Sequence, residues 1–171
     1  MGLRDLQERR TLVAAVGVGS RRPLIPVAAA VVVAADQITK SLALDHLRPY
    51  QARHVVGPVH WYLTFNTGAA FSVGTGVTPI LEAVVVVLIV GLVVFSRKAA
   101  RTATAPVSVA LGMVLGGALS NLGDRLFRHL PVQGGVVDFI RAVTWWPVFN
   151  VADASIVIGV ILLALTWRSR A

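Results

Sequence analysis

The chain has 171 residues, of which 56% are hydrophobic and 14% are charged. Soluble domains carry about 25% charged residues, so the composition argues against a soluble enzyme and for one compact membrane domain. The net charge of +8 does not indicate nucleic acid, because the basic residues lie between apolar blocks without interleaved aromatics. The absence of cysteine excludes disulfides and thiolate metal sites.

Four apolar blocks are long enough to cross a membrane, at about 20 residues per span. They cover about residues 24–44, 77–95, 106–122 and 148–167. Residues 1–23 are predicted to be a cytoplasmic extension, because their short apolar run is closed by Arg21 and Arg22 and lacks a convincing cleavage site. The expected fold is a membrane all-α domain over residues 24–167, followed by a cytoplasmic tail at 168–171.

The distribution of Lys and Arg predicts the orientation of these spans. The N-terminal segment, the 96–105 connection and the C-terminal tail together hold ten of these residues, and the two long loops hold five. Both termini are therefore expected in the cytoplasm, and the loops at about 45–76 and 123–147 are expected outside.

The first outer loop also predicts some β-structure. Residues 54–65 are rich in Val, Trp, Tyr and Phe, and Gly57-Pro58 interrupts them. This pattern is typical of two short strands around a tight turn. The sequence therefore predicts a small extracytoplasmic β-rich subdomain resting on the outer membrane surface.

Two aspartates lie in apolar surroundings at the edges of these spans. Asp138 lies in the outer loop, within the apolar run Val136–Ile140, and Asp153 lies about one turn into the fourth helix, after a possible cap at Asn150. Carboxylates at such a depth are costly and are usually functional. If folding brings them together, they can share a proton and activate water, as in aspartic proteolysis. The alternative is that Asp138 is an ordinary loop residue and Asp153 a helix-start anion.

Other polar residues in the spans are given structural roles. Asp36 and Lys40 are four residues apart and predict a helical ion pair. Gly112, Gly116 and Ser120 form a stripe of small residues that permits close helix approach, with Gly117 and Asn121 in a parallel row. Asp124 is expected to pair with Arg125 and the helix end. The segment Asn66-Thr67-Gly68 is interpreted either as a turn or as part of the site.

The residues indicate neither a metal centre nor a serine nucleophile. The four histidines share no ligand spacing, and Ser72 and Ser155 have no base beside them in the sequence. Two rivals to a protease are a small proton-coupled transporter, with acids spread along several helices, and a non-catalytic assembly factor that uses the small-residue stripe. Neither explains two aspartates at the same outer boundary.

Five segments in order resemble the lipoprotein signal peptidase, or signal peptidase II, family over about residues 24–167. They are Asp36-Gln37-Ile38-Thr39-Lys40, Phe65-Asn66-Thr67-Gly68-Ala69-Ala70-Phe71-Ser72, Gly116-Gly117-Ala118-Leu119-Ser120-Asn121-Leu122-Gly123-Asp124-Arg125, Val136-Val137-Asp138-Phe139 and Phe149-Asn150-Val151-Ala152-Asp153. The resemblance implies an aspartic endopeptidase of the bacterial cytoplasmic membrane. Its substrates would be diacylglyceryl-modified prolipoproteins, cut just before the lipidated cysteine near the outer face.

The resemblance also implies roles for single residues. Asp138 and Asp153 would be the catalytic pair. Supporting and substrate-binding positions would be Asp36, Lys40, Asn66, Gly68, Asn121, Arg125, Asn150 and Ala152. No metal or cofactor is expected; the partners would be lipidated signal peptides, membrane lipid and globomycin-type inhibitors, and the protein would act as a monomer.

Overall fold

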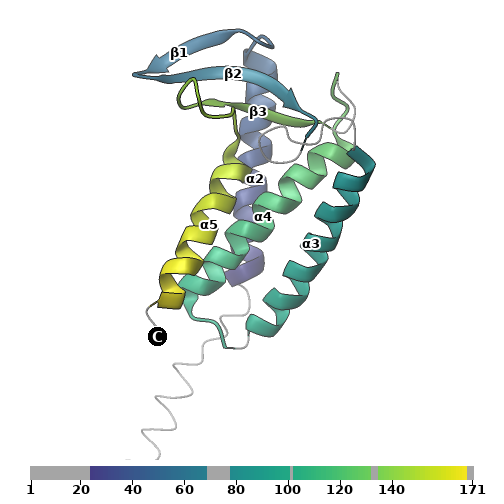
Figure 1. The fold of residues 1–171 in the computed structure, drawn as a ribbon, viewed down its shortest axis with the longest axis vertical. Coiled ribbons are helices and arrows are strands. Elements are labelled where there is room, and N and C mark those ends of the chain that lie inside the picture. The colour runs from purple at the N-terminus through teal and green to yellow at the C-terminus, as the bar shows by residue number, and fades with distance from the viewer. Residues whose placement is uncertain (1–23, 69–77, 101, 132–134, 169–171) are drawn as a thin grey trace, which may run out of the picture.

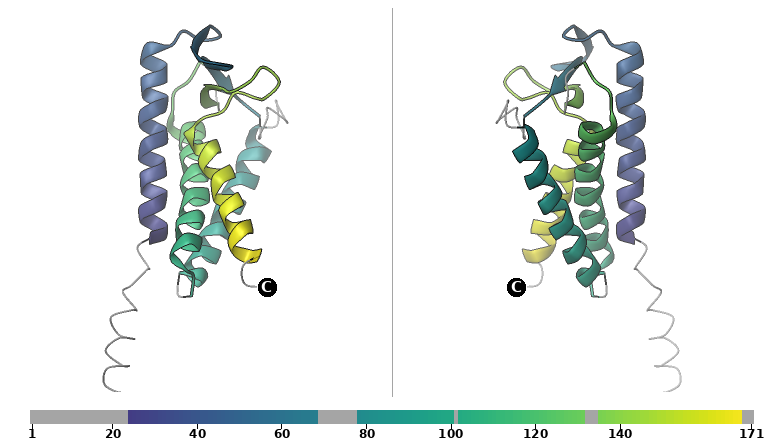
Figure 2. Two further views of the ribbon diagram at one scale, coloured as in Figure 1. Left: turned by 90° about the vertical axis from the view of Figure 1, so that its left-hand side faces the viewer. Right: turned by 90° about the vertical axis from the view of Figure 1, so that its right-hand side faces the viewer.

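The computed structural model describes residues 24–68, 78–100, 102–131 and 135–168. Its elements in chain order are helix α2 (Leu24–His46), strands β1 (Ala52–Val56) and β2 (Val59–Asn66), helices α3 (Thr78–Ala99) and α4 (Ala105–Phe127), strand β3 (Val136–Arg141) and helix α5 (Val151–Arg168). The helices run side by side, and the strands form a sheet across one end of the bundle (Figure 1 and Figure 2). The four predicted helices are thus present, whereas the predicted extension at 1–23 lies outside the described residues.

Helix α4 is the centre of the bundle and packs against α2, α3 and α5. Its glycines permit this close approach. A Cβ atom at Gly116 would lie 2.6 Å from the Ala29 carbonyl oxygen of α2, and one at Gly117 would lie 2.5 Å from the Ala152 carbonyl oxygen of α5. The predicted stripe of small residues therefore faces α2, and the parallel row faces α5.

The sheet has the antiparallel order β1-β2-β3. Gly57 lies in the turn between the first two strands with a φ of +53°, a conformation that favours glycine. The hairpin confirms the strand pair expected in the first outer loop. Strand β3 was not predicted, because the sequence placed Asp138 in a loop.

A small apolar core attaches the sheet to the end of α2. Its buried members are Ala43 from α2, Leu63 from β2, and Val137 and Phe139 from β3. Val137 and Phe139 alternate with Asp138 along β3, so burial of this core fixes the strand that carries the aspartate.

The outward helix faces are apolar. Of the described helices, α2 and α4 are long and apolar enough to cross a membrane. Large exposed hydrophobic side chains occur on all four helices, among them Val31, Ile38, Val87, Leu88, Leu119, Ile161 and Leu165. Apolar surface on this scale suits hydrocarbon better than water, which agrees with a membrane protein.

Candidate active site

Asn150 joins the two aspartates that the sequence singled out. It immediately precedes α5, and its Oδ1 accepts a hydrogen bond from the backbone N–H of Asp153 (2.9 Å). Asp153 Oδ2 accepts in return from the N–H of Asn150 (3.2 Å), the reciprocal arrangement of a capping box. The Nδ2 amide of Asn150 also donates to Asp138 Oδ1 (2.7 Å). One side chain therefore caps the helix and brings both carboxyl groups to the same place.

The sheet supplies the other support of Asp138. Asn66, at the end of β2, donates through Nδ2 to Asp138 Oδ2 (3.1 Å), and its own Oδ1 accepts from the N–H of Gly68 (3.0 Å). The side chain of Asn66 thus reaches the site. The segment Ala69–Ser72, which was part of the same motif, lies outside the described residues.

The environment of Asp138 favours its protonated form. The residue is 2% exposed. Burial, followed by the nearby charge of Asp153, raises the pKa of Asp138 to about 7, against the opposing effects of Asn66, Asn150 and Lys40. Two close carboxyl groups in a site poor in water do not both ionise readily, so the pair tends to hold one proton at neutral pH.

Asp153 is held from α4 by Asn121. The Asn121 Nδ2 group donates to Asp153 Oδ1 (2.8 Å), and Asn121 Oδ1 accepts from Asn150 Nδ2 (3.1 Å). The close packing of α4 on α5 at Gly117, one turn before Asn121, makes this contact possible. Asn121 and Asn150 therefore link the two aspartates into one network.

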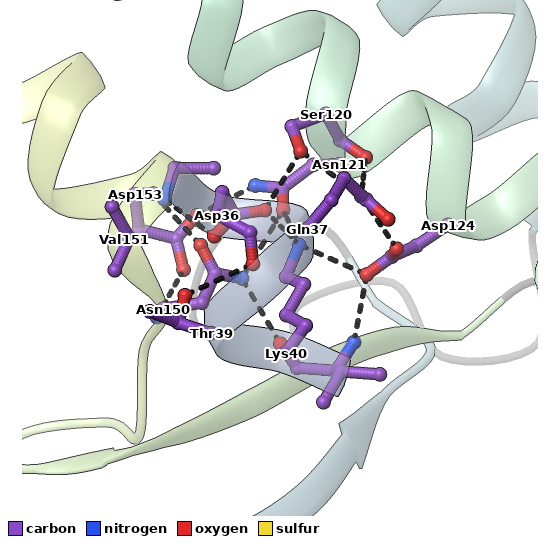
Figure 3. A network of polar contacts seen from close by, with 12 residues as sticks. Asp36, Gln37, Thr39, Lys40, Ser120, Asn121, Asp124, Asn150, Val151 and Asp153 are labelled. Atoms are coloured by element: carbon purple, nitrogen blue, oxygen red, sulfur yellow. Dashed lines mark hydrogen bonds and ion pairs between the residues drawn. The ribbon is translucent and has the colours of Figure 1, made fainter. Parts of the chain in front are cut away.

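A buried ion cluster lies next to this network (Figure 3). Lys40 contacts Asp36 Oδ2 at 2.7 Å and Asp124 Oδ2 at 2.9 Å, and all three side chains are fully buried. Asp36 Oδ1 accepts from the backbone N–H of Ala152 (2.8 Å). The predicted ion pair of Asp36 and Lys40 is confirmed, and it ties α2 to the start of α5.

The prediction that Asp124 pairs with Arg125 was wrong. Asp124 pairs with Lys40 and with Arg128, whose Nε lies 2.9 Å from Oδ1, and it accepts from the N–H of Val137 (3.2 Å). Arg125 instead donates to the backbone oxygen of Gly68. The side chains of adjacent helical residues point about 100° apart around the helix axis. Arg125 therefore points away from the side of α4 on which Asp124 meets Lys40 and Arg128.

The two aspartates line one end of a large cavity of about 760 Å³. Asn66, Asn121 and Arg125 lie on its wall with them. The rest of the wall is mostly apolar and comes from α3, α4, α5, the segment 146–149 and Val136 of β3. Asp138, Asp153 and water could meet a peptide bond there, because a carboxylate and a carboxylic acid can act together as base and acid.

Three contributors to the site were not predicted in their observed roles. Gln37 donates through Nε2 to Asp124 Oδ1 (3.0 Å), Arg128 pairs with the same oxygen, and Ser120 donates to Asp36 Oδ2 (2.8 Å). Polar residues on apolar helices were the available signal. Among the described residues, no group of three or more His, Cys, Asp or Glu side chains is placed to hold a metal ion.

Two solved structures of bacterial membrane enzymes have a similar fold. One is 27% identical, with a TM-score of 0.73 over 89% of each chain. The other is 28% identical, with a TM-score of 0.70 over 88% of this chain and 93% of its own. The chain therefore has the fold of a bacterial membrane enzyme.

A family model described as signal peptidase (SPase) II matches residues 28–168. Two relatives named lipoprotein signal peptidase are each 48% identical: that of Rhodococcus jostii (strain RHA1) over 85% of this chain and 72% of its own, and that of Mycobacterium avium (strain 104) over 80% and 74%. The chain belongs to the signal peptidase II family and is a protease. This result confirms the resemblance and favours the peptidase over the transporter and the assembly factor.

Proposed function

We propose that this signal peptidase cuts diacylglyceryl-modified prolipoproteins just before the lipidated cysteine, with Asp138 and Asp153 as its catalytic residues. The observation that carries the proposal is the hydrogen bonding of Asn150 to both aspartates at the polar end of an otherwise apolar cavity. The names of the relatives support the lipoprotein substrate.

The pair acts as an acid and a base that share one proton. The carboxylate takes a proton from water, which attacks the scissile carbonyl, while the carboxylic acid gives its proton to the carbonyl oxygen. The tetrahedral intermediate then collapses: the carboxylate formed in the first step takes a proton back from a hydroxyl group, the C–N bond breaks, and the other carboxylic acid protonates the amine of the leaving cysteine. Asn66, Asn121 and Asn150 hold the two groups in place through the bonds described above. Pre-set geometry of this kind lowers the entropy cost of reaction.

The apolar part of the cavity suits a signal peptide. Leu88, Ile89 and Leu92 of α3 and Ile156 and Val157 of α5 line it, with α4 contributing Val114 and Ala118. A signal peptide is an apolar helix that leaves lipid only where similar side chains receive it. The backbone near the scissile bond must unwind, and its exposed polar groups need partners. Polar residues on the cavity wall, such as Asn66 and Arg125, supply them.

We further propose four transmembrane helices, with the sheet and the site at the outer face and both termini in the cytoplasm. The bundle ends support this topology: the start of α2, the α3–α4 connection and the end of α5 lie together, away from the sheet (Figure 1). In the sequence, the segments that adjoin these helix ends hold ten Lys and Arg residues, against five in the two long loops. Residues 24–167 act as one peptidase domain, with 1–23 and 168–171 as cytoplasmic ends.

The cavity and all the site residues named above belong to a single chain, so the enzyme is proposed to work as a monomer. Inhibitors of the globomycin type would bind at the aspartates. The membrane lipid beside the helices receives the acyl chains of the substrate, which therefore need no pocket of their own.

The test is cleavage of one prolipoprotein with and without its diacylglyceryl group, at equal concentration in the same bilayer. Each buried methylene contributes about 0.8 kcal/mol, so two acyl chains fix the cysteine at the membrane surface. We expect rapid cleavage of the lipidated form alone, and mass spectrometry should place the cut at the peptide bond immediately before the cysteine. Equal cleavage of both forms would indicate a general membrane protease.

A further inference from the structure

Lys40 uses its whole hydrogen-bonding capacity inside the protein. Its ammonium group lies near Asp36 Oδ2 (2.7 Å), Asp124 Oδ2 (2.9 Å) and Asn121 Oδ1 (2.8 Å). Lys40 is fully buried, and it does not line the cavity that the aspartates share. An ammonium group has three donors, and each has one acceptor here. The carboxylates of Asp36 and Asp124 form the ion cluster with Lys40. The third acceptor, Asn121, connects Lys40 to Asp153.

The contact of Lys40 with Asn121 helps to set the orientation of the Asn121 amide. An ammonium group donates and cannot accept, so the oxygen of Asn121 must face Lys40 and the nitrogen must face away. The nitrogen then donates to Asp153 Oδ1 (2.8 Å). In the reversed orientation, the NH₂ group of Asn121 would face the Lys40 ammonium group, donor against donor. Its oxygen would face the Asp153 carboxylate, acceptor against acceptor. Lys40, together with the Asn150 Nδ2 group that donates to the same oxygen (3.1 Å), therefore selects the orientation that supports the charged form of Asp153.

The charge of Lys40 also acts at the aspartates. The charged groups around the pair are Asp36 and Lys40 from α2, Asp124 and Arg125 from α4, Asp138 from β3 and Asp153 from α5. Lys40 is among the groups that lower the pKa of Asp138. A positive charge at this depth is weakly screened by solvent, so its effect reaches several ångströms.

We propose that Lys40 is a positioning residue for the catalytic pair: its ammonium group orients the amide of Asn121 toward Asp153, and its charge favours the singly ionised pair needed to activate water. The inference rests on the proposed roles of Asp138 and Asp153. It gives Lys40 a part in the reaction, although the residue does not line the cavity.

Two charge-balanced double variants separate this role from simple stabilisation. Asp36, Asp124, Lys40 and Arg128 sum to zero charge, and Arg128 contacts Asp124 but not Asn121. Lys40→Met with Asp124→Asn removes one charge of each sign, as does Arg128→Gln with Asp124→Asn. The two doubles share one substitution, keep the cluster neutral and differ in which cation is lost.

The readout is the pH dependence of kcat, alongside KM, in purified enzyme with lipidated substrate. The acid limb is the part of the kcat–pH profile in which activity rises with pH. Loss of a positive charge favours the protonated carboxylic acid, so this limb should move to higher pH by about one unit in the Lys40 double. KM should change little. The acid limb of the Arg128 double should stay with that of the wild type. Identical limbs in both doubles would overturn the proposal.

Lys40→Gln gives a second measurement, because its amide can still donate to Asn121 while the charge is lost. We expect the acid limb to move in the same direction and at least as far, because Asp124 keeps its negative charge in this variant, with a plateau of kcat at high pH above that of the Lys40 double. If both Lys40 variants fail to fold while the Arg128 double folds, the role is structural and the proposal is wrong. A wild-type profile without any acid limb would instead contradict the proposed roles of Asp138 and Asp153.

Discussion

The backbone N–H of Ala152 donates to the carboxylate of Asp36 across 2.8 Å, joining α2 to the first turn of α5. The first N–H groups of a helix have no partner within it, and they attract negative charge. Asp36 satisfies one of them next to Asp153. A residue 116 positions away in the chain thus fixes the helix start that presents a candidate catalytic group.

Asp36→Ala should destabilise the protein strongly. It removes the partner of the Ala152 N–H and leaves Lys40 with one carboxylate fewer in a buried place. Breaking a buried ion pair on one side costs about 3–5 kcal/mol. Thermal unfolding in detergent measures the effect. Asp45→Ala is the matched control, because Asp45 lies on the same helix but is exposed, and it should leave the melting temperature unchanged. Equal melting temperatures for both variants would refute the anchoring role.

Gly117→Ala should lower stability and activity together. A Cβ there would lie 2.5 Å from the Ala152 carbonyl oxygen and 2.7 Å from Ile156 Cγ1, so α4 and α5 must move apart. Overpacking of this kind costs about 1–3 kcal/mol, and the shift would disturb the bond of Asn121 to Asp153. Gly123→Ala on the same helix meets nothing within 4 Å and should be neutral or slightly stabilising. A Gly117→Ala enzyme as stable and active as the Gly123→Ala enzyme would contradict the packing argument.

Stability should fall as pH rises from about 4 to about 7. Burial, with the charge of Asp153, raises the pKa of Asp138 from 3.8 to about 7, so in this range the folded state binds more protons than the unfolded state. Unfolding then becomes easier as pH rises, by on the order of 4 kcal/mol from this group. Asp138→Asn should remove most of this slope. The check is the unfolding free energy of both proteins against pH, and parallel curves would contradict the raised pKa.

Labelling of introduced cysteines tests the proposed topology, because the natural chain has none. Thr102 lies in the α3–α4 connection and Thr144 between β3 and α5, and both side chains are exposed. In intact cells an impermeant thiol reagent should label Thr144→Cys and leave Thr102→Cys unlabelled. Permeabilised cells provide the control, in which both should react. Labelling of Thr102→Cys alone in intact cells would show that the helices cross the membrane in the opposite orientation.

Much of the fold is predictable because its signals are local. Apolar runs of about 20 residues give the helices, and Gly57-Pro58 between β-branched and aromatic residues gives the hairpin. Strand β3 was missed because an aspartate interrupts its apolar run, although Val136, Val137 and Ile140 are typical strand residues. The family motifs had already indicated Asp138 and Asp153.

The partners of the buried charges were harder to predict because they come from different helices. The sequence predicted the neighbouring Arg125 as the ion-pair partner of Asp124. The observed partner on the same helix is Arg128, four residues later, which lies on the same face as Asp124. Its second partner, Lys40, depends on how α2 packs against α4 at Gly116. The link from Lys40 through Asn121 to Asp153 spans three helices, and no spacing within one segment reveals it.

The most direct test is turnover of a lipidated prolipoprotein by Asp138→Asn and Asp153→Asn enzymes in one bilayer, with each variant checked by thermal unfolding. An amide can replace a protonated carboxyl as a donor but cannot take a proton from water. Each variant should stay folded. Because the two groups share one proton, the loss of either carboxyl group should lower kcat by at least about a thousandfold. Substantial cleavage by either folded variant would contradict the assignment of Asp138 and Asp153 as the catalytic pair.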